Sequence, residues 1–306
     1  MQEDNVMPRK IIVLTGATSG FGRHTLALLV QEQGTTVFVG ARGTDRDVPP
    51  GVEVLPLDLA SLDSVRTFAA LLEERLEGAG IDVLILNAGV HGATADQLSA
   101  EGFGLTFAVN HLAHYLLSRL LLPKLSKGGR LVITSSNMHE PPLKRLAPKG
   151  LEIEAWAHPF PGGSGTGTRS YCASKLCNLM TAQSLARTEL VRERGIEVIA
   201  FNPGLTGGAS GGDASALQKA VVSVLIRTVF PLIALINPTF KMNAPEHSGR
   251  MLADVATGTI PMPEGRVYVS LVGGKPTFPA PSALAQDVEA QDRLWRESAR
   301  MTSLDR

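Results

Sequence analysis

Cysteine is nearly absent from this 306-residue sequence. Its two cysteines, Cys172 and Cys177, are five residues apart in a segment that we expect to be helical. That spacing puts them about 7.5 Å apart along the helix axis, which is too far for a comfortable disulfide. The polar stretch MQEDNVMPRK at the start also lacks the apolar core of a signal peptide. We therefore expect a cytosolic protein with free thiols.

The sequence has no excess of one charge. Its 29 basic and 29 acidic residues balance and are interspersed, so there is no basic surface to recruit nucleic acid or an acidic membrane. Uninterrupted apolar runs are missing too, because Arg227 and Pro231 break the apolar segment 220–236. These absences predict a protein with no nucleic-acid partner and no transmembrane segment. With 44% hydrophobic residues, the chain can nevertheless build a large core.

Short apolar runs alternate with segments of helical period along most of the chain. The apolar runs predict strands at residues 10–15, 36–40, 52–57, 83–87, 130–134, 197–202 and 266–270. The periodic segments predict helices near residues 20–33, 61–77, 99–126, 169–194 and 283–302. The strand runs are continuous rather than alternating, as in strands buried on both faces. We expect an α/β fold: a Rossmann-type, doubly wound parallel sheet of about seven strands with helices on both faces.

Two segments interrupt this alternation. Residues 137–168 are rich in proline, glycine and lysine, and residues 205–245 begin with a glycine-rich stretch and become strongly apolar. Because no internal repeat or interdomain linker is evident, we expect one domain, 1–306, with an insertion near 137–168 and a second near 205–245.

A glycine-spaced turn, TGATSGFG, follows the first predicted strand and opens a predicted helix. The free N–H groups at the start of a helix bind phosphate, and glycines at Gly16, Gly20 and Gly22 would allow a close approach to the backbone. We expect the pyrophosphate of a dinucleotide to bind there. On this interpretation, replacing Gly22 by valine weakens nucleotide binding and leaves the fold intact.

Polar motifs follow the later strands: Asn87-Ala88-Gly89, Ser135-Ser136 and Asn202-Pro203-Gly204, with YCASK at residues 171–175. Through TGATSGFG, LDLAS, NAGV, Asn110, ITSS, YCASK and NPG, the chain resembles the short-chain dehydrogenase/reductase family over about residues 9–302. The stretches EGFGLTFAVNHLAHYLLSRLLLPKL, YCASKLCNLMTAQSLA and DRLWRESA look most like its retinol-dehydrogenase-like and light-dependent protochlorophyllide oxidoreductase subgroups.

Tyr171 and Lys175 are four residues apart and so share one face of a helix. A nearby ammonium favours the phenolate, so we expect Lys175 to lower the pKa of Tyr171. Tyr171 would then exchange a proton with a substrate oxygen, and Ser136 would hydrogen-bond the same oxygen. The resemblance implies that Lys175 also holds the nicotinamide ribose and that Asn110 orders a water in the proton relay.

The nucleotide is expected to be NADP(H). The second predicted strand ends in Gly40-Ala41-Arg42 with no acid before Asp45, whereas NAD selectivity normally needs a carboxylate there. Arg42 lies where a guanidinium could pair with a 2′-phosphate. From the resemblance, the expected cofactor-binding residues are Gly16, Thr18, Ser19, Gly20, Phe21, Gly22, Arg42, Asp58, Leu59, Asn87, Ala88, Gly89, Tyr171, Lys175, Pro203, Gly204 and Thr206. By the residue pattern alone, Asp58 could instead cap the following helix.

The apolar segment within 205–245 occupies the place of the family's substrate lid. It predicts a bulky apolar substrate such as a retinoid, steroid or polyketide, or an edge that touches a membrane surface, and a buried helix or dimer contact is the alternative. The oligomeric state stays open.

Two other functions are compatible with the resemblance. One is reduction of a carbon–carbon double bond, possibly light-driven, although Leu205 and Ser136 depart from the pattern of the protochlorophyllide enzymes. The other is a non-catalytic NADPH sensor. His111 and His114 are three residues apart without a third ligand, so we expect packing rather than a metal site.

Overall fold

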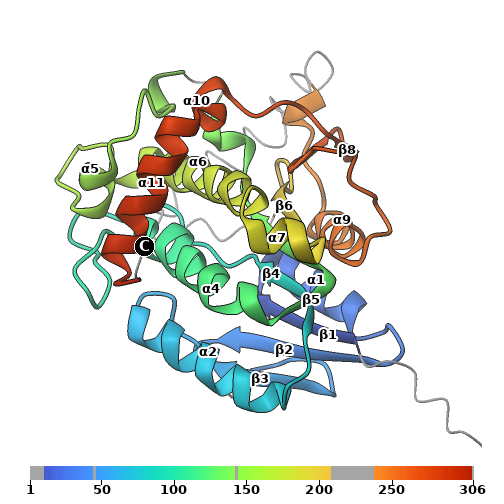
Figure 1. Ribbon diagram of the computed structural model, residues 1–306. Helices are drawn as coiled ribbons and strands as arrows, with labels where there is room; N and C mark the ends of the chain where they lie inside the picture. The colour runs from blue at the N-terminus through green and yellow to red at the C-terminus, as the bar shows by residue number, and fades with distance from the viewer. Residues whose placement is uncertain (1–9, 44–45, 142–143, 208–237, 305–306) are drawn as a thin grey trace, which may run out of the picture.

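A single sheet organises this computed structural model, which describes residues 10–43, 46–141, 144–207 and 238–304. The strand order is β3-β2-β1-β4-β5-β6-β7-β8 (Figure 1). Neighbours from β3 to β7 pair in parallel, and β8 pairs antiparallel with β7. The bounds are β1 (Lys10–Thr15), β2 (Thr35–Ala41), β3 (Val52–Pro56), β4 (Ile81–Leu86), β5 (Leu125–Thr134), β6 (Glu197–Asn202), β7 (Tyr268–Val272) and β8 (Lys275–Thr277).

Helices connect these strands. Their bounds are α1 (Gly20–Leu29), α2 (Leu62–Leu76), α3 (Leu105–Phe107), α4 (Ala113–Leu121), α5 (Ile153–Ala157), α6 (Gly167–Ala186), α7 (Glu189–Arg194), α9 (Pro245–Thr257), α10 (Ala283–Gln286) and α11 (Val288–Met301). A π-helical turn, Ala108–Leu112, joins α3 to α4, and short 3₁₀ turns occupy Leu122–Lys124, Asn137–His139, Lys144–Leu146 and Pro238–Phe240.

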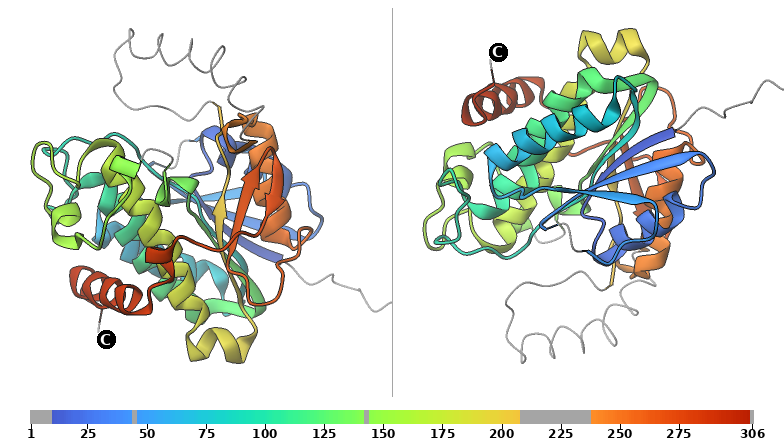
Figure 2. Two further views of the ribbon diagram at one scale, coloured as in Figure 1. Left: turned by 90° about the horizontal axis from the view of Figure 1, so that it is seen from above. Right: turned by 90° about the horizontal axis from the view of Figure 1, so that it is seen from below.

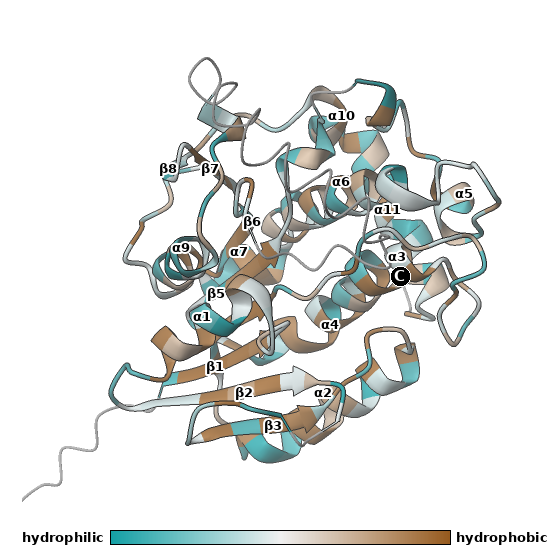
Figure 3. Cartoon of the chain, turned by 180° about the vertical axis from the view of Figure 1, so that it is seen from behind, coloured by the Kyte–Doolittle hydropathy of each residue, from teal (hydrophilic) through white to brown (hydrophobic). Residues whose placement is uncertain are grey.

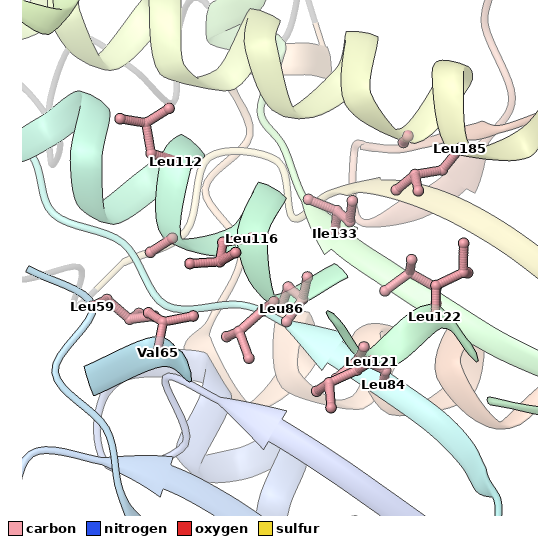
Figure 4. Packing of buried hydrophobic residues seen from close by; sticks show 14 of the residues in the cluster. Leu59, Val65, Leu84, Leu86, Leu112, Leu116, Leu121, Leu122, Ile133 and Leu185 are labelled. Atoms are coloured by element: carbon pink, nitrogen blue, oxygen red, sulfur yellow. The ribbon is translucent and has the colours of Figure 1, made fainter. Parts of the chain in front are cut away.

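Alternate residues of the strands enter two cores, one on each face of the sheet. In β1, Ile11 and Val13 join a cluster with α2, α4 and α6, whereas Ile12 and Leu14 join one with α1 and α9. Figure 2 shows these two helical layers, and Figure 3 shows how apolar residues mark strands such as β5 and β6. In Figure 4, leucines of α4 gather with residues of α2 and β4 on the first face. The two-sided burial explains why the strands are apolar throughout.

The predicted doubly wound sheet is confirmed, with an eighth strand, β8, added at one edge. Three predicted helices differ in detail. The helix expected at 99–126 begins at Leu105, the one at 169–194 divides into α6 and α7, and the one at 283–302 divides into α10 and α11. Asp287 explains the last break, because its carboxylate accepts the N–H of Ala290 and caps α11.

The two interrupting segments differ in what can be said of them. Within 137–168 the chain forms 3₁₀ turns and α5 but no strand in the part that the structure describes. Most of the expected lid, residues 208–237, lies outside the described residues. A further helix, α9, follows it and was not predicted; it packs against α1.

Candidate functional site

The turn after β1 is packed against the chain's own backbone. Gly16 has φ +68°, and a Cβ there would lie 2.6 Å from the backbone of Ala88. A Cβ at Gly22 would overlap the carbonyl oxygen of Gly16 and lie 2.6 Å from Nδ2 of Asn87. The protein's own backbone and the Asn87 side chain thus already require glycine at both positions, and the expectation that these glycines also let a phosphate approach stays a prediction. Replacing Gly22 threatens the fold itself.

The first turn of α1 is different, because it is open. Gly20 has φ +54°, and no atom lies within 4 Å of the position its Cβ would take. Ser19 is the N-cap residue but makes no side-chain cap, and no acidic residue lies in the first turn. Thr18 and Phe21, which flank these residues, are half-buried. Free N–H groups at a helix start without a carboxylate suit an anion.

Asn87 ties three neighbouring strands together at their carboxyl ends. Its N–H donates to Thr15 Oγ1 at 3.0 Å, and its Nδ2 donates to the carbonyl of Gly16 at 3.0 Å. Its Oδ1 accepts from Thr134 Oγ1 at 3.0 Å. Asn87 thus connects the ends of β1, β4 and β5.

Asn110 lies in the π-helical turn and is fully buried. Its side chain binds the backbone of Val90 in both directions, with Oδ1 accepting the N–H at 2.7 Å and Nδ2 donating to the carbonyl at 2.9 Å. Nδ2 also donates to Ser174 Oγ at 3.0 Å. Because a Cβ at Gly89 would lie 3.3 Å from Asn110 Oδ1 and 3.7 Å from Lys175 Nζ, these three residues meet closely.

Three side chains expected in catalysis come together at α6, which carries two of them, and the end of β5, which the third follows. Lys175 is buried one turn after Tyr171, and its Nζ lies 5.5 Å from the centroid of the Tyr171 ring. Nζ donates to the carbonyl of Thr134 at 2.9 Å. Ser136, just after β5, accepts the N–H of Met138 through its Oγ at 3.2 Å, and its hydroxyl is near enough to Tyr171 to influence the pKa of that residue. The site therefore lies where β5 and α6 meet.

The predicted direction of the Tyr171 pKa shift is wrong. Burial raises the pKa of Tyr171 to about 12, and the nearby Ser136 hydroxyl only partly opposes this. Burial also lowers the pKa of Lys175 to about 8. The ammonium does not hold the tyrosine as phenolate, because it is itself desolvated and is directed at the Thr134 carbonyl.

The residues expected around the outer part of the nucleotide lie after β2 and β3. Arg42 is exposed directly after β2, and its carbonyl accepts from the guanidinium of Arg46. Arg23 of α1 pairs with Asp47 at 2.9 Å. Asp58 is exposed, whereas Leu59 after it is buried.

Asp58 does not cap the helix that follows. Its Oδ1 accepts the N–H of Ala60 at 3.0 Å, and Ser61 caps α2 by accepting the N–H of Ser64 at 3.2 Å. The capping alternative for Asp58 is therefore wrong.

Pro203, Gly204 and Thr206 form the turn after β6. Gly204 has φ +68° and packs on the backbone of Leu271. Thr206 Oγ1 contacts the carbonyl of Pro203 at 3.2 Å and Ser248 Oγ of α9 at 2.8 Å. The turn is thereby joined to α9, so all the residues expected to bind the cofactor lie at the carboxyl edge of the sheet or at its adjoining helices.

Sequence reasoning missed two contacts of the site. His91 stacks edge-on against Tyr171, with 4.7 Å between ring centroids. Thr15 supplies the hydroxyl that holds the backbone of Asn87 and Ala88. The NAGV motif that precedes His91 was the only signal for the former, and none existed for the latter.

His111 and His114 are buried and hydrogen-bonded, in agreement with the packing prediction. Within the described residues, no cluster of three potential metal ligands occurs, and no helix is both long and apolar enough to cross a membrane. Cys172 and Cys177 are free, as predicted, and both are buried.

Comparison with known proteins identifies sequence relatives over nearly the whole chain. A family model described as short chain dehydrogenase matches residues 10–148. Protochlorophyllide reductase B of Oryza sativa subsp. japonica is 31% identical over 95% of this chain and 77% of its own length. Retinol dehydrogenase 13 of Homo sapiens is 31% identical over 98% of this chain and 86% of its own length.

Solved structures share the fold. A protein of Mycobacterium paratuberculosis without an assigned function has a TM-score of 0.68 and 26% identity over 97% of this chain and 95% of its own. A short chain dehydrogenase of Burkholderia cenocepacia in complex with NADP has a TM-score of 0.59 and 22% identity over 88% and 99%. An NADPH-bound carbonyl reductase from chicken fatty liver has a TM-score of 0.55 and 21% identity over 82% and 87%. At these identities the last two resemblances concern the fold alone.

Proposed function

Because the chain belongs to the short chain dehydrogenase family, we propose that it is an NADP(H)-dependent oxidoreductase that interconverts a carbonyl and an alcohol on a bulky apolar substrate. The observation that carries this proposal is the meeting of Tyr171, Ser136 and Lys175 at the edge of the sheet that also presents the open start of α1. Acid–base and anion-binding groups are thus adjacent.

The residues present fit a dinucleotide phosphate. The first turn of α1 offers uncapped N–H groups beside the open position at Gly20. Arg42 is exposed after β2, where a guanidinium can pair with a 2′-phosphate. Two solved structures of the same fold hold NADP or NADPH, so this fold can accommodate such a nucleotide. The nicotinamide, when bound, supplies the hydride.

The raised pKa of Tyr171 suits the carbonyl-reducing direction. At neutral pH its hydroxyl stays protonated, so it can donate a proton to a substrate oxygen. Ser136, whose hydroxyl influences the pKa of Tyr171, stabilises negative charge on the same oxygen. Lys175, whose pKa is about 8, can supply the proton that replaces the one donated by Tyr171. Asn110 holds Val90 and thereby shapes the backbone around these groups.

The class of substrate rests on the relatives and on the sequence. The relatives' names refer to retinol and protochlorophyllide, both of which are largely apolar molecules. The apolar segment within 205–245 is the proposed lid, and its membrane contact and the cytosolic location stay predictions.

The second candidate is reduction of a carbon–carbon double bond. It is favoured by the protochlorophyllide reductases, which are 29–31% identical to the chain. Ser136 and Leu205 favour carbonyl chemistry instead, because both depart from the pattern of the protochlorophyllide enzymes. A non-catalytic sensor is the weakest candidate, because the chain keeps both Tyr171 and Lys175.

The decisive experiment measures NADPH consumption in the dark with a panel of bulky apolar aldehydes and ketones. Tyr171→Phe should lower kcat by about 10³-fold, within the range that general acid catalysis contributes, with the Kd for NADPH changed less than about twofold. Tyr115→Phe is the matched control, because that hydroxyl donates to Trp295 and lies away from the site. Turnover that survives Tyr171→Phe would refute the assignment, and turnover only in the light would favour the second candidate.

A further inference from the structure

Two buried histidines lie on neighbouring turns but bind in different directions. His111 Nε2 lies 2.8 Å from Ser298 Oγ of α11. His114 Nε2 lies 3.3 Å from Thr15 Oγ1, at the end of β1, and its Nδ1 lies 3.1 Å from the carbonyl oxygen of Asn110. His111 therefore joins the π-helical turn to α11, and His114 joins the end of β1 to the backbone of Asn110.

The hydrogen bonds of Thr15 determine which nitrogen of His114 carries the proton. Thr15 Oγ1 accepts the N–H of Asn87 at 3.0 Å and that of Ala88 at 3.2 Å. A hydroxyl has two acceptor lone pairs and one hydrogen, so the hydrogen is left for His114 Nε2. Nε2 is then the acceptor, and the ring proton is on Nδ1, which donates to the Asn110 carbonyl. Every donor and acceptor in this set is satisfied.

These bonds close a ring around the segment 87–90. Thr15 holds its first two N–H groups, and the Asn110 side chain holds both backbone groups of Val90. His114 connects Thr15 and Asn110, the two residues that hold this segment. Thr15 directly precedes the glycine turn, so these hydrogen bonds join the glycine turn to the π-helical turn that carries Asn110.

We propose that His114 is a positioning residue that keeps the glycine turn, the segment 87–90 and Asn110 in register for cofactor binding and turnover. This inference rests on the proposed function. Replacing the His114 imidazole by an apolar side chain leaves the Thr15 hydroxyl and the Asn110 carbonyl buried with fewer partners. Unpaired buried groups rearrange or admit water.

The bridge requires a neutral ring, since a protonated Nε2 cannot accept from Thr15. Burial lowers the pKa of His114 to about 3, and the Lys175 ammonium on α6 acts in the same direction. His111, on its own helix, is the other ionisable group facing it among the described residues, and burial lowers its pKa to about 3 as well. The bridge is therefore expected to persist throughout the working pH range.

The test compares His114→Leu and His114→Gln with the matched control His111→Leu. We expect His114→Leu to lower kcat/KM about tenfold or more and to raise the Kd for NADPH about threefold or more, which is the size of effect that one lost buried hydrogen bond produces. Gln offers one donor and one acceptor at similar separation and should restore both values to within about threefold. His111→Leu should lower thermal stability with unchanged Kd. Equal Kd and kcat/KM in both leucine variants would overturn the proposal.

A spectroscopic measurement separates this proposal from the proposed function. Nitrogen-15 NMR of His114 should show a protonated Nδ1 and a bare Nε2 from pH 5 to 8.5. Thr15→Val should shift the Nε2 signal and raise the Kd for NADPH, whereas Thr15→Ser should leave both nearly unchanged. A protonated Nε2 or a titrating ring would overturn the bridge. If no substrate is turned over, the proposed function fails, yet the NMR signals and the NADPH Kd still decide the role of His114, also when His114→Leu does not fold.

Discussion

Single alanine substitutions at Gly20 and Gly22 should have opposite consequences, although the two glycines are two residues apart. A Cβ at Gly22 would overlap the carbonyl oxygen of Gly16, which is backbone and cannot rotate away. A Cβ at Gly20 would meet nothing within 4 Å, and only the positive φ of +54° opposes it. The pair therefore separates a packing role from a binding role within one turn.

The magnitudes follow from these contacts. Overpacking against the backbone at Gly22 costs about 3 kcal/mol or more, and alanine recovers about 1 kcal/mol in helix propensity, which leaves a net loss of about 2 kcal/mol or more. At Gly20 the left-handed conformation costs about 1–2 kcal/mol, and the stiffer unfolded chain returns about 0.4–1 kcal/mol. For 306 residues, the unfolding entropy of about 0.6 kcal/mol per degree converts these values into a fall in Tm of about 3 °C or more for Gly22→Ala and about 2.5 °C or less for Gly20→Ala.

Thermal unfolding without nucleotide, followed by titration with NADPH, checks both expectations. Gly20→Ala should stay folded and bind NADPH about tenfold or more weakly, because its methyl group stands in the open space at the start of α1. A Gly22→Ala variant that melts within about 1 °C of the wild type would refute the packing argument. Unchanged NADPH affinity in Gly20→Ala would refute the phosphate site.

Two further predictions concern charge. In steady-state kinetics, Arg42→Ala should raise the KM for NADPH about tenfold and leave the KM for NADH nearly unchanged. Arg46→Ala, at a neighbouring arginine, is the control. An equal effect of Arg42→Ala on both nucleotides would contradict the 2′-phosphate contact. Burial lowers the pKa of Lys175 from 10.5 to about 8, so the unfolded chain binds more protons than the folded protein between these pH values. The free energy of unfolding, compared with that of Lys175→Met, should therefore rise from pH 8 to pH 10 by no more than about 3 kcal/mol. Urea unfolding at pH 7.5, 9 and 10 measures this, and a falling difference would show that the sign is wrong.

The sheet was predictable because its evidence is local. The first and sixth predicted strands, 10–15 and 197–202, match β1 and β6 residue for residue, since buried apolar runs bounded by polar residues have few alternatives. The three residues of β8 form an antiparallel edge that no period could reveal. The helix α9 did carry terminal signals, with Pro245 in its first turn and the left-handed Gly258 at its end, but its own polar face and the apolar segment before it obscured them.

The candidate site was predictable in its members but not in their energetics. Motif order brought Ser136, Tyr171 and Lys175 together correctly. The sign of the Tyr171 pKa shift was wrong because desolvation depends on the packing around a group, which the spacing of two residues does not contain. The bridge from Thr15 to His114 spans 99 residues, and no local pattern connects them.

The covering of α4 by α11 has a consequence for synthesis. Ser298, the hydroxyl partner of His111, is added 187 residues after it. At about 5–20 residues per second, the ribosome needs about 10–40 seconds to make that stretch. Throughout this interval His111 of the π-helical turn and Tyr115 of α4 lack their native partners Ser298 and Trp295. The nascent chain therefore exposes aromatic surface for chaperones to bind, and a ribosome stalled before α11 leaves that surface uncovered.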